Sequence, residues 1–171
     1  MRIKFLITLF GLLLSLPGIG QSIYNRYSSR MTADGMCYFF RNKKLTETEA
    51  IKRLDYDMTY LDWKDSVTVN FTIWADAPQL PKSLKIISEV DTLVCDNLKR
   101  LFVDITKKGY EIRMSSLFSK EEIRKMIHST SAPIFTFDMD RKNATATYSK
   151  SSWEKDSKKL QIILQLIDST K

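Results

Sequence analysis

The clearest pattern of apolar and polar positions lies in residues 54–73. Apolar side chains occupy every second position in Leu54–Tyr60, and again in Val67–Ile73. Two runs of period two around a short polar turn are typical of an antiparallel β-hairpin with one buried face. A slip of one residue would move every apolar side chain to the opposite face, so the pattern also predicts the register.

Two further hairpins are predicted downstream. Residues 98–106 and 110–117 flank Gly109, which is free to take a positive φ in the turn between them. A strand that starts at Pro133 and a return strand over 144–149 form the next hairpin. Shorter strands are expected at 35–41, 84–88 and 92–95.

Helix-start signals precede two longer apolar stripes. Ser119 and Glu122 match a capping box at the start of a short helix, and Ser151 and Glu154 match one before a helix over about 152–168. A similar pair, Thr46 and Glu49, predicts a turn of helix over 47–52. The last helix has its apolar stripe at Trp153, Leu160, Ile163, Leu164 and Ile167, widened by Ile162 and Leu166.

The order of these elements predicts the fold class. Hairpin connections indicate an antiparallel sheet, and an amphipathic helix must bury its stripe against something. We therefore expect an α+β domain over 34–171, with the sheet covered by the C-terminal helix and one short helix. A β-sandwich with peripheral helices is the alternative. Residues 21–33 are polar without a clear period, and predict a flexible lead-in or an edge segment.

Residues 1–20 have the layout of a secretory signal peptide. Arg2 and Lys4 precede the apolar run Phe5–Leu16, and small residues follow at the positions that a signal peptidase reads, just before Gln21. The run is short for a membrane span, which needs about 20 apolar residues, although a retained anchor is the alternative. We expect an exported protein, periplasmic or at the cell surface, with no transmembrane span after signal removal.

Composition excludes several functional classes. The chain of 171 residues is long enough for one domain. Beyond the leader only Gly35 and Gly109 remain, so a glycine-rich phosphate loop or dinucleotide fingerprint is excluded. His128 is the only histidine, which excludes a His-rich metal site. We expect no metal and no cofactor.

The charge balance is basic, at +7 for the whole chain. Residues 101–171 carry 13 basic and 9 acidic groups, which favours an anionic partner. In an exported protein this partner would be an acidic glycan, a lipid head group or an acidic envelope protein, and not a nucleic acid. The alternative is that the lysines are scattered over solvated faces.

Cys37 and Cys95 are the only cysteines. Export would place them where a disulfide can form, and a bridge would close a loop of about 60 residues. Each also lies in an apolar run, where a free cysteine behaves as a small buried hydrophobe. The sequence leaves both alternatives open.

Three groups of polar residues are candidates for catalysis or metal binding. His128 could act as a base toward a cysteine thiol, but its place at a helix end favours a surface residue. Asp138 and Asp140 occupy alternate positions, as calcium ligands do in loop sites. The loop lacks the glycine and the distal glutamate of an EF-hand, which favours a strand that runs into a turn. Asp55 and Asp57 also occupy alternate positions of a strand, and we interpret them as like charges on its solvated face.

The remaining candidates are surface residues that could bind a partner. Trp63 beside Lys64 lies in a predicted turn, where an aromatic ring can stack on a sugar or contact a partner, or fold back onto the hairpin. Lys155, Lys158 and Lys159 are expected on the solvent side of the last helix. We therefore expect a small exported domain with a binding or interaction role at the envelope, without catalysis. The alternatives are an assembly subunit of an envelope complex and a periplasmic hydrolase.

Overall fold

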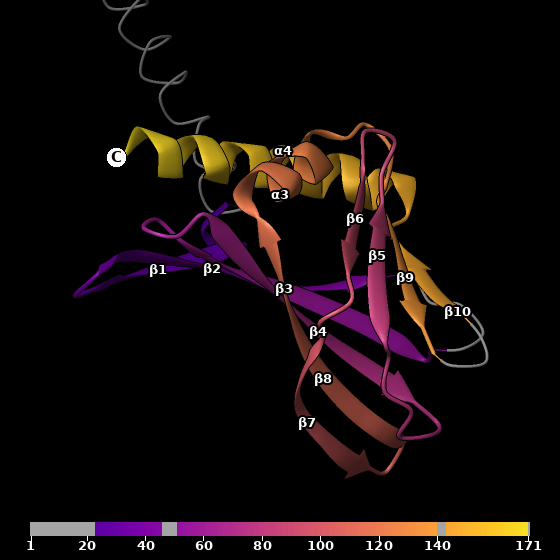
Figure 1. Ribbon diagram of the computed structural model, residues 1–171. Helices are drawn as coiled ribbons and strands as arrows, with labels where there is room; N and C mark the ends of the chain where they lie inside the picture. Colours follow the sequence, from indigo (N-terminus) through magenta and orange to yellow (C-terminus); the bar gives the residue numbers. More distant parts are fainter. Residues whose placement is uncertain (1–22, 46–50, 140–142, 171) are drawn as a thin grey trace, which may run out of the picture.

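The computed structural model describes residues 23–45, 51–139 and 143–170. In this part of the chain it contains two antiparallel sheets and two helices (Figure 1). One sheet has six strands in the order β1-β2-β3-β4-β8-β7, and the other has four in the order β10-β9-β5-β6. The elements are β1 (Tyr27–Thr32), β2 (Gly35–Leu45), β3 (Arg53–Leu61), β4 (Ser66–Ala75), β5 (Ser83–Ile87), β6 (Thr92–Cys95), β7 (Lys99–Thr106), β8 (Gly109–Ser119), α3 (Lys120–His128), β9 (Ile134–Asp138), β10 (Asn143–Thr147) and α4 (Lys150–Ser169).

The hairpin with the strongest period-two pattern forms in the predicted register. Leu54 of β3 lies opposite Ile73 of β4, and Tyr60 lies opposite Val67. All eight alternating apolar side chains are buried. The other side of β4 pairs with β8, which extends this buried face across the centre of the larger sheet.

Aromatic contacts join the two sheets face to face. The ring of Tyr56 in β3 lies 5.2 Å from that of Phe135 in β9, and Phe71 in β4 lies 5.6 Å from Phe137. Tilted and edge-to-face pairs at these distances are favourable beyond their buried area. The α+β class with antiparallel hairpins and a C-terminal helix is confirmed, but the strands divide into two sheets that enclose the core between them.

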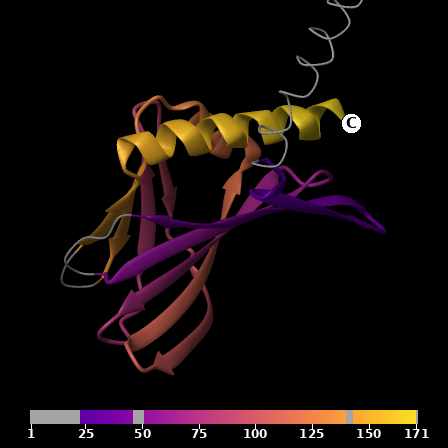
Figure 2. The same ribbon diagram turned by 180° about the vertical axis from the view of Figure 1, so that it is seen from behind.

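Helix α4 lies across one end of the sheets, next to α3 (Figures 1 and 2). All five side chains predicted for its stripe are buried, whereas Ile162 is half-buried and Leu166 is 45% exposed. Its N-cap is Ser149, whose side chain makes no capping hydrogen bond. The predicted capping box of Ser151 and Glu154 is therefore wrong, because the helix has already begun at Lys150.

The other predicted caps and the lead-in have different outcomes. The capping box of Ser119 and Glu122 is confirmed, with backbone-to-side-chain hydrogen bonds of 3.1 and 2.7 Å. The Thr46–Glu49 pair lies outside the described residues.

The lead-in contains β1, an edge strand paired with β2, so the larger sheet begins before residue 34. No helix in the described part of the chain is long and apolar enough to cross a membrane.

Candidate functional site

A cluster of polar side chains is buried beneath the first half of α4. Arg26 donates from Nε to Asp156 Oδ1 at 2.8 Å and from Nη2 to Oδ2 at 3.1 Å. The Tyr148 hydroxyl donates to the same carboxylate at 2.9 Å and shares a hydrogen bond with the Tyr56 hydroxyl. Lys43 Nζ lies 4.0 Å from Asp156 Oδ1. We call these five residues the Asp156 cluster.

Helix α4 brings Asp156 into this cluster through its helical spacing. Asp156 follows Trp153 by three positions and precedes Leu160 by four, so all three lie on one side of the helix. All three are buried. Sequence reasoning missed Asp156, although a carboxylate within an apolar stripe was a signal that a cationic partner would be buried with it.

Burial and charge shift the acid–base properties of the cluster. Burial, followed by the nearby charge of Asp156, raises the pKa of Tyr56 to about 12. The same two causes, together with Tyr56, raise the pKa of Tyr148 well above its ordinary value. Burial disfavours the charged form of Arg26, but the acidic groups around it outweigh this and raise its pKa. Both tyrosines therefore remain neutral hydrogen-bonding groups at physiological pH.

The Asp156 cluster connects α4 with both sheets and has a structural role. Its members come from the segment before β1, from β2, β3 and α4, and from the residue that follows β10. Among the described residues, no buried side-chain nitrogen or oxygen lacks a hydrogen-bond partner. The cluster can thus hold α4 over both sheets, with its polar atoms occupied by one another.

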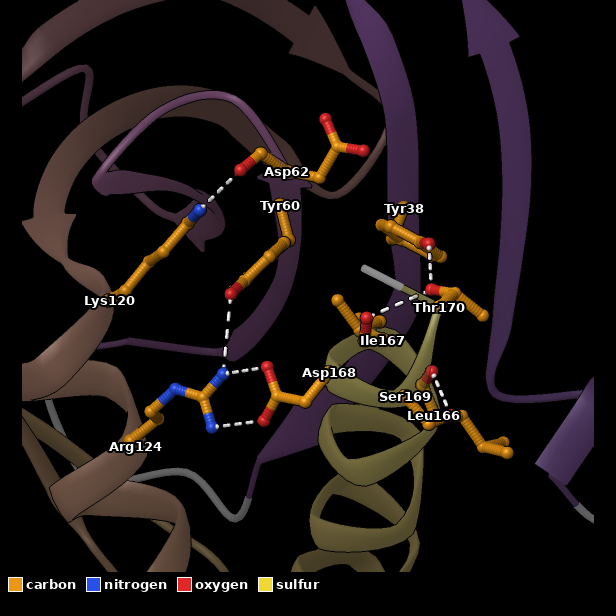
Figure 3. A network of polar contacts seen from close by, with 10 residues as sticks. All are labelled: Tyr38, Tyr60, Asp62, Lys120, Arg124, Leu166, Ile167, Asp168, Ser169 and Thr170. Carbon is orange, nitrogen blue, oxygen red and sulfur yellow. Dashed lines mark hydrogen bonds and ion pairs between the residues drawn. The ribbon is translucent and has the colours of Figure 1, made fainter.

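A second network connects α3 with the C-terminal end of α4 (Figure 3). Arg124 donates to both carboxylate oxygens of Asp168, at 2.8 and 2.6 Å, and to the Tyr60 hydroxyl at 3.4 Å. Lys120 donates to the backbone oxygen of Asp62 at 3.0 Å and lies 4.5 Å from the centre of the Tyr60 ring. The hydrogen bonds to Asp168 are the main reason that the pKa of Arg124 is raised.

A third network lies on the opposite face of the larger sheet and corrects one prediction. Asp55 is only 3% exposed and accepts a hydrogen bond from Arg53 Nε at 2.9 Å. Asp57 accepts from Asn70 at 2.8 Å and from Arg113 at 2.6 Å. The expectation that Asp55 lies on a solvated face is therefore wrong: arginine pairing and the neighbouring strands remove it from water. Each carboxylate is paired with an arginine.

The predicted binding residues lie on separate elements. Trp63 and Lys64 are in the turn between β3 and β4, and Trp63 is 37% exposed. Its ring also lies over the β1–β2 turn, where a Cβ added to Gly35 would be 2.9 Å from Trp63 Cε3. The predicted lysines are on α4, with Lys155 and Lys158 exposed and Lys159 half-buried.

The remaining sequence candidates have ordinary structural surroundings. Cys37 lies in β2 and Cys95 in β6, in different sheets, and both are buried free thiols. His128 is the exposed last residue of α3, with Nδ1 2.8 Å from the backbone oxygen of Arg124. Asp138 and Asn143 are paired at the end of the β9–β10 hairpin, and Asp140 lies outside the described residues. Within the described ranges, no three His, Cys, Asp or Glu residues are grouped as a metal site would require.

The hairpin β7–β8 is the feature that sequence reasoning did not single out. Strand β7 is the terminal strand of the larger sheet. It exposes Leu101 by 45%, Phe102 by 36% and Ile105 by 82%. Its turn lies at the end of the molecule farthest from α4 (Figures 1 and 2). The successive apolar residues Leu101, Phe102 and Val103 are typical of a strand that is buried on both faces, so the sequence pattern did not indicate this exposure.

Comparison of the chain with protein-family models finds no match, and comparisons with curated proteins and with solved structures find none either.

Proposed function

We propose that this chain is an exported, non-catalytic domain that binds a component of the cell envelope through its β7–β8 hairpin. The observation that carries the proposal is the exposure of Leu101, Phe102 and Ile105 on one terminal strand. Phe102 and Ile105 lie on opposite faces of β7, so apolar surface is exposed on both sides of this sheet edge, and such exposure is typical of an interaction site.

Two other features support this function. The signal-peptide layout of residues 1–20 favours export. The polar networks around Asp156, Asp168 and Asp55, of which the first is buried and the second partly exposed, consist of internal ion pairs and hydrogen bonds. They stabilise a scaffold on which a projecting hairpin is held in place.

A second candidate function is that of an assembly subunit that adds a strand of a partner to β7. The terminal position of β7 favours this candidate, since an edge strand has backbone groups available for pairing. Under this alternative, backbone hydrogen bonds along β7 would supply the affinity and its side chains the specificity.

Fractionation of host cells together with site-specific crosslinking tests the proposal. We expect the recovered chain to begin near Gln21 and to occur in the envelope fractions. A photo-crosslinking side chain in place of Ile105 should capture an envelope component. The same side chain in place of Met31, which is 70% exposed on another hairpin, should not. A chain that starts at Met1 in the cytosol, or equal capture from both positions, would contradict the proposal.

A further inference from the structure

The exposed apolar side chains of the β7–β8 hairpin are accompanied by basic residues at both ends of β7. Residues 99–108 contain four basic residues and one acidic residue, Asp104. Lys107 and Lys108 form the turn directly after β7 and are exposed. Apolar side chains next to several lysines and arginines are characteristic of protein surfaces that contact anionic lipids.

The most exposed apolar side chain lies next to this turn. Ile105 is 82% exposed, more than any other large apolar side chain in the described part of the chain. Lys52 donates from Nζ to the backbone oxygen of Lys108 at 3.0 Å and also forms an ion pair with the exposed carboxylate of Asp76. Asp76 therefore balances the charge of Lys52, and the hairpin end combines the projecting side chain of Ile105 with the two exposed lysines of the turn, Lys107 and Lys108.

The turn is also held in a defined position. Gly109 has a φ of +119°, and a Cβ added there would lie 2.5 Å from the backbone oxygen of Ala75 at the end of β4. Because the turn packs so closely on β4, Ile105 and the lysines are presented from a fixed support. The turn is at the far end from both helices, so a flat surface can approach it without meeting α4 (Figures 1 and 2).

Strand addition to β7 fits these observations less well. The pairing of β7 with β8 shifts register between Arg100 and Phe102, which is a bulge or irregularity in the edge. Asp104 is in the second half of the strand, and lysines follow it. Bulges and charged side chains are devices that protect an edge strand against pairing with another chain. The bulge does not oppose contact with lipid head groups, and the lysines that follow Asp104 favour contact with anionic ones.

We infer that the β7–β8 hairpin docks on an anionic lipid surface, an inference that rests on the proposed envelope function and names its partner. Ile105 enters the boundary between head groups and acyl chains, while Lys107 and Lys108 contact the anionic head groups. Phe102 lies three positions before Ile105, on the opposite face of β7, and is not part of this contact. The affinity is the sum of a small apolar term and an electrostatic term, so binding is reversible and weakens with salt.

Vesicle co-flotation of the chain recovered after export tests this inference. The probes are phosphatidylcholine vesicles with about one quarter phosphatidylglycerol, against pure phosphatidylcholine. We expect flotation with the anionic vesicles only, decreasing as salt is raised. The change Ile105→Ser should weaken partition roughly tenfold. The change Lys107→Ala with Lys108→Ala should weaken it roughly thirtyfold.

Two variants on other surfaces serve as controls. Met31→Ser removes a similarly exposed apolar side chain, and Lys85→Ala with Lys150→Ala removes two exposed lysines on other elements; both should float like the unaltered chain. Circular dichroism and thermal unfolding of every variant show that the fold is retained. Equal binding by unaltered chain and hairpin variants, or no binding to anionic vesicles, would overturn the inference. In the second case, capture of an envelope protein from position 105 would leave the proposed function standing.

Discussion

Two arginine–carboxylate pairs hold α4 at its two ends, and they differ in burial much more than in geometry. Arg26 and Asp156 pair at 2.8 and 3.1 Å, and Arg124 and Asp168 at 2.8 and 2.6 Å. The first pair has side chains 9% and 3% exposed, whereas the second pair has side chains 32% and 44% exposed. Equal contacts in such different surroundings have different consequences for stability.

The difference follows from solvation. When one partner of a buried pair is removed, the other is left as an uncompensated charge away from water, which costs about 3–5 kcal/mol. At a partly exposed pair, water and salt ions replace the lost partner, and the typical contribution is about 0–1 kcal/mol. Arg26 and Asp156 therefore determine whether α4 can remain on the sheets, whereas Arg124 and Asp168 adjust how firmly its last turn is held.

The largest effect is expected from Asp156→Ala. This change leaves Arg26 buried without its carboxylate, and it should lower the free energy of unfolding by about 3–5 kcal/mol in urea titrations. The double change Arg26→Met with Asp156→Leu should recover most of the loss, because it removes both charges and keeps apolar volume. A double variant as unstable as the single variant would show that the hydrogen bonds, and not the charge balance, are decisive.

A smaller effect is expected at high pH, where the buried tyrosines of the Asp156 cluster ionise. The pKa of Tyr56 is raised to about 12, and an unfolded tyrosine ionises near 10. Between these values the unfolded chain loses a proton that the folded chain keeps. The contribution of Tyr56 to the free energy of unfolding is therefore fully present below pH 10 and is lost as the pH rises toward 12. We expect a loss of roughly 2 kcal/mol across this window.

The variant Tyr56→Phe provides the matched measurement for this pH dependence. Chemical unfolding at several pH values should give a flatter profile between pH 10 and 12 than that of the unaltered chain. The raised pKa of Tyr148 acts in the same direction and should leave part of the slope. An unchanged slope in Tyr56→Phe would place the titrating group elsewhere.

The smallest effect is expected from Arg124→Ala at the exposed pair. The free energy of unfolding should fall by no more than about 1 kcal/mol, and the difference from the unaltered chain should shrink as salt is added. Lys125→Ala is a control on the same helix, because Lys125 makes an exposed pair with Glu121 at 3.0 Å. A loss at Arg124 as large as that at Asp156 would remove the distinction between the two ends of α4.

The sequence by itself determined the local structure of most of the chain. Alternation in Leu54–Tyr60 and Val67–Ile73 was sufficient for the β3–β4 hairpin and its register, because period two decides which side chains face the core. The stripe of α4 and the capping box at Ser119 were equally readable, since both depend on residues within a few positions of one another.

The tertiary structure alone decided the features that join distant segments. Arg26 and Asp156 are 130 residues apart, and no local period relates them. The division into two sheets depends on which hairpins pack face to face, as Tyr56 does with Phe135. The exposure of Ile105 likewise follows from the terminal place of β7. Periodicity assigns a side chain to a face, but only the packing of the whole chain decides whether that face meets the core, a charge or water.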